Sequence, residues 1–139
     1  MQHFSIPAYC YFLFAAITVA SAPAMAVSAS DYTAQATAEN PRFKGFSANT
    51  GKQFYSARQG AQAGTESCAS CHTADPKTSG KHVRTNKPIL ALAPVANPER
   101  LSDPAKVEKW FKRNCNDVLA RACTAQEKGD FIAYLQSVR

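Results

Sequence analysis

Residues 66–75 read ESCASCHTAD and contain two cysteines spaced C-x-x-C with a histidine directly behind them: Cys68, Cys71 and His72. Two thiols at this spacing can bond to the two vinyl groups of one haem, and the next residue can present its imidazole to the iron. The motif therefore predicts one covalently attached haem c, held by Cys68 and Cys71, with His72 as the proximal iron ligand.

Two other kinds of site share this cysteine spacing. A structural zinc site needs four ligands, and Cys115 and Cys123 do not form a second C-x-x-C pair. A thioredoxin-like dithiol needs a βαβ context, and the sequence has no strand-like alternation of useful length. Both interpretations are weaker than the haem interpretation.

The N-terminal segment is typical of a secretory signal. Residues 7–20 are almost continuously apolar, and Ala24-Met25-Ala26 has the small-x-small pattern of a cleavage site. We therefore expect a cleaved signal peptide over residues 1–26 and a periplasmic cytochrome c domain over residues 27–139. An uncleaved N-terminal anchor is the alternative, because positions 1–26 contain no Lys or Arg.

The exported part is the size of one domain and carries the whole formal charge of +6. This charge suits an acidic partner surface, anionic lipid head groups or simple solubility. A nucleic-acid partner is not indicated, because no basic block is interleaved with aromatic residues. Four cysteines and two histidines, but no methionine, remain after Ala26.

The pattern along residues 27–139 predicts an all-α domain of four to five short helices around the haem. We expect a loosely held leader or a frayed helix over residues 27–41, a helix at about 45–59 and a long irregular loop over 73–100. Asp103 and Pro104 predict a helix start, and Thr124 begins a capping box that predicts the final helix.

Two apolar stripes are expected on these helices. Residues three and four apart on a helix share one face. The stripe after Asp103 consists of Val107, Trp110 and Phe111, and the stripe on the last helix consists of Phe131, Tyr134, Leu135 and Val138.

The sixth position of the iron is the open question, because the exported part has no methionine to fill it. The iron is five-coordinate, or it takes His82, the one spare imidazole, or it takes an asparagine such as Asn114. Capping of a helix end is the ordinary role for Asn114 and Asn116.

Asn114 directly precedes Cys115, near the expected end of its helix. A bond between Cys115 and Cys123 would therefore affect the backbone at Asn114. Eight residues of continuous helix would separate the two cysteines by about 12 Å. A disulfide allows at most about 7 Å between the Cα atoms. If the two are bonded, the chain must therefore turn between them.

A family resemblance appears in the second half of the chain. The segment KHVRTNKPILALAPVANPER from residue 81, followed by VEKWFKRNC, DVLARACT and EKGDFIAYL, resembles the sphaeroides haem protein family over about residues 45–138. These proteins are exported cytochromes c with the class I fold. The last helix of that fold crosses the first near a glycine, for which Gly51 and Gly129 are the candidates.

The resemblance implies a set of site residues. Asn114 would be the distal ligand of the ferric iron, Cys115 would pair with Cys123, and Pro88 and Trp110 would contact the haem. Ala91 stands where the family pattern favours proline, so the carbonyl that orients His72 would come from Pro88 or from Pro94.

The implied ligand also implies a function. An amide oxygen is a hard donor that suits Fe(III) better than Fe(II), so reduction should release Asn114 and open the site to O₂, NO or CO. The expected function is that of an exported monohaem cytochrome that transfers electrons and binds a diatomic gas. The family implies a dihaem cytochrome c and a membrane cytochrome b as electron partners.

Two alternatives to this function stay open. One is a haem-based enzyme that converts O₂ or NO, although the sequence shows no nucleophile–base pair and no catalytic carboxylate pair. The other is a plain electron carrier with bis-histidine ligation by His72 and His82.

Overall fold

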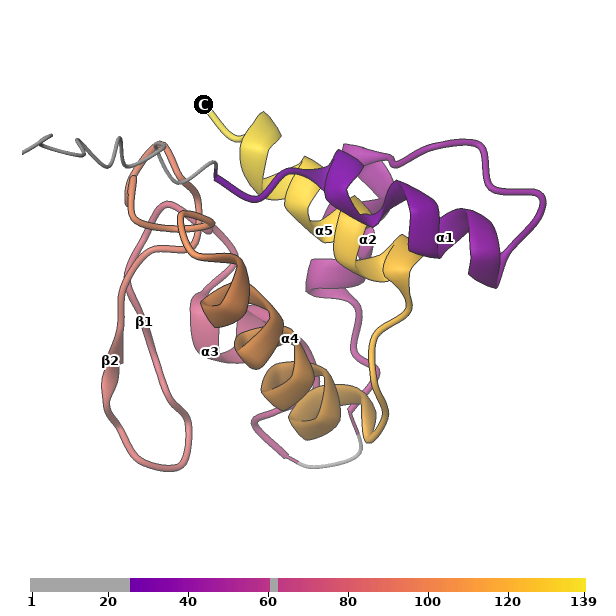
Figure 1. Ribbon diagram of the computed structural model, residues 1–139. Coiled ribbons are helices and arrows are strands. Elements are labelled where there is room, and N and C mark those ends of the chain that lie inside the picture. Colours follow the sequence, from indigo (N-terminus) through magenta and orange to yellow (C-terminus); the bar gives the residue numbers. More distant parts are fainter. Residues whose placement is uncertain (1–25, 61–62) are drawn as a thin grey trace, which may run out of the picture.

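The computed structural model describes residues 26–60 and 63–139 (Figure 1), so the predicted signal peptide lies outside the described residues except for Ala26. The described part is mainly helical, as predicted. Its elements in chain order are the 3₁₀ helix η1 (Ala29–Tyr32), α1 (Thr33–Glu39), α2 (Ala48–Ser56), α3 (Ala69–His72), β1 (Gly80–Lys81), β2 (Pro88–Ile89), α4 (Pro104–Leu119) and α5 (Ala125–Ser137).

The segment that contains η1 and α1 is helical and packed, so the expectation of a loosely held leader is wrong. Val27, Tyr32 and Ala36 are buried, and the Val27 N–H donates to the Leu101 carbonyl at 2.6 Å. The Tyr32 hydroxyl donates to Glu108 on α4 at 2.5 Å. Tyr32 and Ala36 lie four residues apart on one helical face. One such pair in a polar segment is not enough to indicate a helical period.

α2 and α5 cross at Gly51, as predicted. A Cβ on Gly51 would overlap the backbone carbonyl of Asp130 on α5, so only glycine allows this approach. The buried Asp130 carboxylate accepts a hydrogen bond from the Ser47 N–H at 2.6 Å and so ties the start of α2 to α5. Gly129 is also a close contact, but it meets the ring of Phe46 rather than α2.

α4 begins at the predicted residue but ends later than expected. The Asp103 side chain accepts from the Lys106 N–H at 3.0 Å, with Pro104 as the first helical residue. The helix continues to Leu119 and ends at Ala120, which has the left-handed φ of 55°. Asn114 therefore lies inside the helix and not at its end.

The predicted face of α4 is only partly buried. Val107 and Phe111 pack against the core, whereas Trp110 is 41% exposed.

Two clusters of buried residues make up the core of the described part of the chain. The first joins the N-terminal segment to α5 and consists of Val27, Tyr32, Ala36, Leu101, Ala125 and Ile132. The second consists of Tyr55, Tyr134 and Leu135, with Cys68, Ala69, Leu92, Phe131 and Val138 packed against it.

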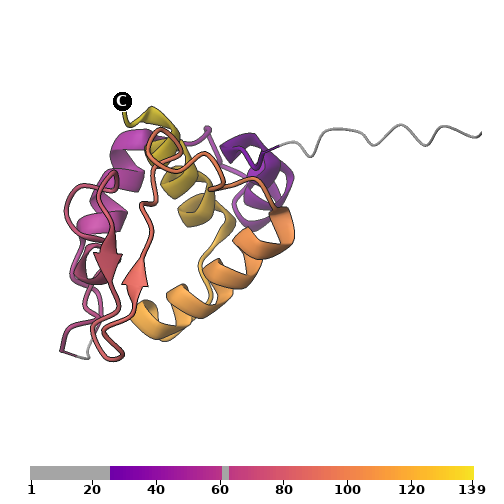
Figure 2. The same ribbon diagram turned by 90° about the vertical axis from the view of Figure 1, so that its left-hand side faces the viewer.

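The loop over residues 73–100 is irregular, as predicted, except for a short antiparallel hairpin. β1 pairs with β2 in the register Gly80 to Ile89 and Lys81 to Pro88. Strands of two residues are too short to show an alternating pattern, so the sequence could not reveal them. Figure 2 shows this hairpin and α4 on different sides of the molecule. None of the helices within the described ranges has the length and apolar character needed to cross a membrane.

Candidate haem site

α3 places the motif residues on one short turn of helix. Cys68 precedes the helix, and its carbonyl accepts from the His72 N–H at 3.1 Å. Cys68 and Cys71 are both half-buried and neither is in a disulfide. Burial raises the pKa of the Cys68 thiol to about 11, so the thiol stays protonated. Two unpaired thiols therefore lie one turn apart, with the imidazole next to the second.

The His72 imidazole is neutral near pH 7, which is the form that can bind a metal. Burial and the nearby charge of Arg100 lower the pKa of His72 to about 4. The imidazole is therefore uncharged near pH 7 and keeps a lone pair for a metal. Arg100 is held in place because its guanidinium donates to the carbonyls of Ala91 and Leu90, each at 2.8 Å.

Tyr55 supports the motif through its hydroxyl, which donates to the carbonyl of His72 at 3.1 Å and to that of Thr73 at 2.5 Å. Thr73 has a φ of 66°, which costs energy for a residue other than glycine. Burial raises the pKa of Tyr55, so the hydroxyl remains a donor. Gly80 on β1 also lies against the motif, because a Cβ there would overlap the Cys71 carbonyl.

The sequence did not reveal these supports. Tyr55 is simply an aromatic residue of the core in the sequence, and nothing in the pattern assigns its hydroxyl to a carbonyl 17 residues away. Arg100 belongs to the quoted family segment, but its position near His72 depends on the path of the irregular loop. No local signal in the sequence specifies that path.

Removing the Tyr55 hydroxyl is expected to destabilise the protein. Tyr55→Phe would leave two carbonyls beside His72 without their donor, which costs about 1–2 kcal/mol in the free energy of unfolding. Urea denaturation of the haem-loaded protein would measure this loss. The control is Tyr134→Phe in the same cluster, because the Tyr134 hydroxyl has no hydrogen bond to a described residue. Equal losses in the two variants would contradict the role given to Tyr55.

Asn114 is placed differently from an ordinary helix cap. Its side chain is half-buried, and it makes no hydrogen bond to another described residue. It lies one turn after Trp110, whose ring is 5.5 Å from the guanidinium of Arg113. The interpretation of Asn114 as a cap is wrong, because the helix continues beyond it as far as Leu119.

A disulfide joins Cys115 to Cys123, with 5.6 Å between their Cα atoms. The chain turns between the two, at Ala120, and α5 begins just after Cys123. Both cysteines are buried. The disulfide therefore fixes the backbone next to Asn114.

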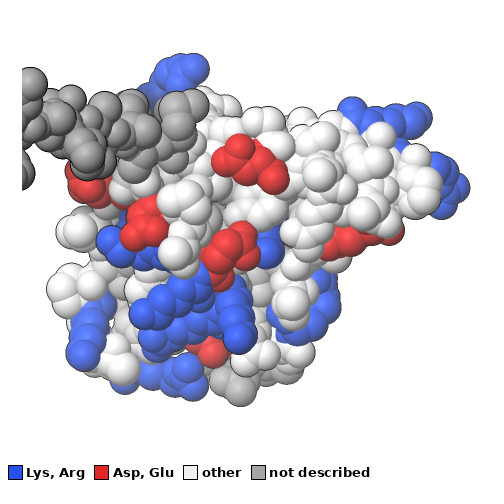
Figure 3. All heavy atoms as spheres, in the orientation of Figure 1, with Lys and Arg blue, Asp and Glu red and all other residues white. Residues whose placement is uncertain are grey.

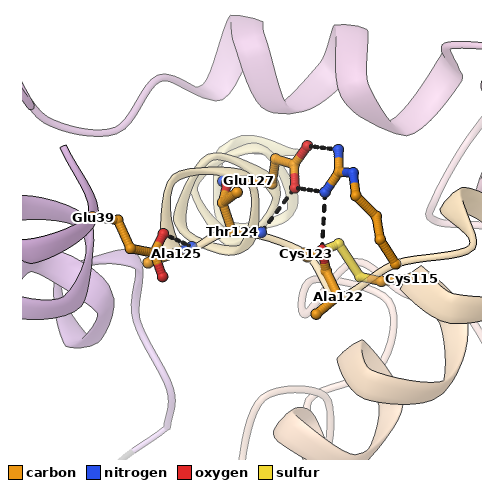
Figure 4. A network of polar contacts seen from close by, with 8 residues as sticks. Glu39, Cys115, Ala122, Cys123, Thr124, Ala125 and Glu127 are labelled. Carbon is orange, nitrogen blue, oxygen red and sulfur yellow. Dashed lines mark hydrogen bonds and ion pairs between the residues drawn. A yellow bond between two sulfur atoms is a disulfide. The ribbon is translucent and has the colours of Figure 1, made fainter.

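Figure 4 shows a network of polar contacts around this disulfide. Glu127 accepts two hydrogen bonds from Arg121, at 2.8 and 2.6 Å, and one from the Thr124 N–H at 2.8 Å. The Ala125 N–H donates to Glu39 of α1 at 2.8 Å. These contacts satisfy free N–H groups at the start of α5, and they hold the backbone that follows Cys123.

His82 lies in the turn of the β1–β2 hairpin. Its Nδ1 accepts from the N–H groups of Arg84 and Thr85, at 3.3 and 3.2 Å. One of its two nitrogens is therefore used to hold the turn. Pro88 is exposed on β2, and no hydrogen bond joins the His72 imidazole to Pro88 or Pro94 among the described residues.

The residues present fit a haem. They supply two thiols on one turn and a neutral imidazole, and large apolar side chains on the following loop and on α4 are left exposed. Leu90 in the loop is 67% exposed and Trp110 on α4 is 41% exposed. The described residues contain no group of three or more His, Cys, Asp or Glu side chains that could hold a metal ion.

Comparison with known proteins supports the same conclusion. Residues 41–135 match a family described as a domain of unknown function, DUF1924. The chain is 49% identical over 82 residues to the cytochrome c-type protein SHP of Cereibacter sphaeroides, a match that covers 59% of this chain and only 63% of SHP. It is 43% identical over 105 residues to cytochrome c'' of Methylophilus methylotrophus, which covers 75% of this chain and 73% of that protein.

Solved structures of both relatives have the same fold, so the predicted cytochrome c fold is confirmed. Oxidized cytochrome c'' matches with a TM-score of 0.72 at 40% identity, over 80% of this chain and 91% of the other. Oxidized SHP, described as an oxygen binding cytochrome c, matches with a TM-score of 0.68 at 39% identity, over 80% of this chain and 97% of the other. The covalently bound haem c predicted from the motif is thereby confirmed as the cofactor.

Proposed function

Because the chain belongs to the family of cytochromes c that contains SHP and cytochrome c'', we propose that it is an exported monohaem cytochrome that accepts an electron and then binds a diatomic gas. The observation that carries this proposal is the environment of Asn114. A half-buried amide without a hydrogen bond to a described residue lies beside a disulfide on α4, in a chain whose exported part lacks methionine.

Three residues would hold the cofactor. Cys68 and Cys71 would form the two thioether bonds, and the neutral imidazole of His72 would bind the iron on the proximal side. Pro88 and Trp110 are proposed to contact the porphyrin. The haem supplies an iron that takes up one electron and, when ferrous, has affinity for O₂, NO and CO.

Asn114 would control access to the distal side. Its amide oxygen is a neutral, hard donor, so it prefers the ferric over the ferrous state. Reduction would weaken this bond and release the side chain, which leaves room for a gas. SHP is described as oxygen binding, and a structure of cytochrome c'' is described in terms of haem-ligand detachment. Both descriptions agree with this proposed role.

The proposed location is the periplasm, after cleavage of a signal peptide over residues 1–26. The Cys115–Cys123 disulfide supports an oxidising compartment. A dihaem cytochrome c and a membrane cytochrome b are the electron partners that the family resemblance implies.

Absorption spectra of the purified protein test this function. We expect the ferrous spectrum to change when CO or NO is added, and the protein to bind O₂ without consuming it in repeated turnovers. A low-spin ferrous spectrum that does not respond to CO would instead indicate a closed bis-histidine carrier with His72 and His82. Continuous consumption of O₂ or NO in the presence of a reductant would indicate an enzyme.

A further inference from the structure

The outward face of α4 carries a cluster of positive side chains. Lys106, Lys109, Lys112 and Arg113 are all exposed. Figure 3 shows Lys and Arg side chains gathered over α4, in the same orientation as Figure 1. These four residues are called the α4 basic face below.

The charge of this face is not cancelled by neighbouring acidic residues. Lys106, Lys109 and Lys112 form no ion pair with any described residue, and Arg113 reaches Asp117 only at 3.9 Å across exposed side chains. Such a pair is screened by water and contributes little. Glu108 is already engaged by Lys128 of α5, at 2.7 Å. The basic face therefore keeps a positive field toward solvent.

The face lies on the helix that carries Asn114, on the side of α4 that points to solvent. Arg113 directly precedes Asn114, and its guanidinium lies 5.5 Å from the ring of Trp110, the residue proposed to contact the porphyrin. Arginine is among the residue types that contribute most to protein–protein interfaces. A helix with its side chains is about 10–12 Å across, so the solvent face of α4 is separated from its inner face by only that distance.

We propose that the α4 basic face is the docking surface for an acidic redox protein that reduces the haem. This inference rests on the proposed function. In the step, one electron leaves the reduced centre of the partner and converts Fe(III) to Fe(II), and no atom is transferred. The electron would arrive through the helix that carries Asn114, the residue that reduction is proposed to release.

The test measures the rate at which an acidic electron donor reduces the ferric haem protein. Reduced flavodoxin, an acidic one-electron donor, serves as the probe at low ionic strength. In the variant K109E/K112E we expect the second-order rate constant to fall about tenfold or more, because opposite charges accelerate association by at least that factor. The matched control K44E/K52E makes the same change in net charge at exposed lysines outside α4, and its rate should fall by less than about twofold.

Two further measurements test whether a slower rate comes from weaker docking or from a change at the haem. Reduction by lumiflavin semiquinone, which is small and uncharged, should be equally fast in all three proteins, and the ferrous spectra with CO should be identical. Equal losses in both variants would overturn the proposal, because the net charge alone would then explain the rate. Loss of binding to phosphatidylglycerol vesicles without loss of the flavodoxin rate would overturn it in favour of a membrane surface. A spectrum that ignores CO in every protein would instead count against the proposed gas binding.

Discussion

Replacing Asn114 with valine is expected to raise the apparent affinity of the ferric protein for an external ligand such as azide by about 10- to 100-fold. An internal ligand that occupies the iron in 90–99% of molecules lowers the apparent affinity of an external ligand by roughly this factor. Valine removes the amide oxygen and keeps a similar volume. The CO affinity of the ferrous protein should not change, because Asn114 is proposed to be released in that state.

The same variant should have a higher reduction potential. A ligand that binds only the ferric state stabilises it, and each factor of ten corresponds to about 59 mV for a one-electron couple. Loss of Asn114 should therefore raise the potential by about 60–120 mV. Spectroelectrochemical titration measures the potential, and azide titration measures the affinity. The two shifts must agree in size, because they report the same internal bond.

Two control variants make this prediction specific. Asn116→Val changes an exposed asparagine on the same helix and should leave both quantities unchanged. His82→Ala should also leave the ferric spectrum as it is. If His82→Ala changes the ferric spectrum while Asn114→Val does not, the distal ligand is His82.

Removal of the disulfide is the second change with a large expected effect. Replacing both Cys115 and Cys123 with serine opens a ring closed across a sequence separation of 8. The free energy of unfolding should fall by about 2–3 kcal/mol, because the unfolded chain gains the freedom that the ring denied it. Guanidinium denaturation of the haem-loaded protein measures this loss. The ferric spectrum should shift as well, since Cys115, the residue after Asn114, would no longer be tied to the start of α5.

Arg121→Ala is the control for the disulfide variant. It removes the hydrogen bonds to Glu127 in the same network but leaves the disulfide in place. Arg121 is 48% exposed, so this loss should cost about 0–1 kcal/mol and leave the ferric spectrum unchanged. If the disulfide variant retains the ferric spectrum of the natural protein, the bond between the two cysteines has no part in placing the ligand.

Local signals in the sequence predicted the parts of the fold that depend on local chemistry. The Asp103 cap with Pro104 and the capping box at Thr124 lie where they were expected, because each needs only residues within one turn. The family resemblance, and no local signal, made Gly51 and Gly129 the candidates for the helix crossing, and Gly51 lies there. The two helix starts follow from short-range geometry that sequence spacing expresses directly.

Features that depend on distant contacts were missed or misplaced. Val27 and Tyr32 are buried only because other segments cover them, and their own segment is polar. The end of α4 was expected near Asn114, because asparagine is common at helix ends. The helix continues to Leu119, since no helix breaker lies between Asn114 and Ala120. The support of His72 by Tyr55 depends on contact between α2 and the motif, which no spacing encodes.

α4, the helix that carries Asn114, is held by contacts near both of its ends, and this limits the motions that could open the distal site. The Tyr32–Glu108 hydrogen bond holds the first half of α4, and the Cys115–Cys123 disulfide holds the backbone next to Asn114. Displacement of the whole helix would take microseconds to milliseconds, and rotation of one side chain on a fixed helix is faster. With the backbone held, opening would proceed by rotation of the Asn114 side chain. Gas uptake by the reduced protein, in which Asn114 is proposed to be released already, should then need no displacement of α4.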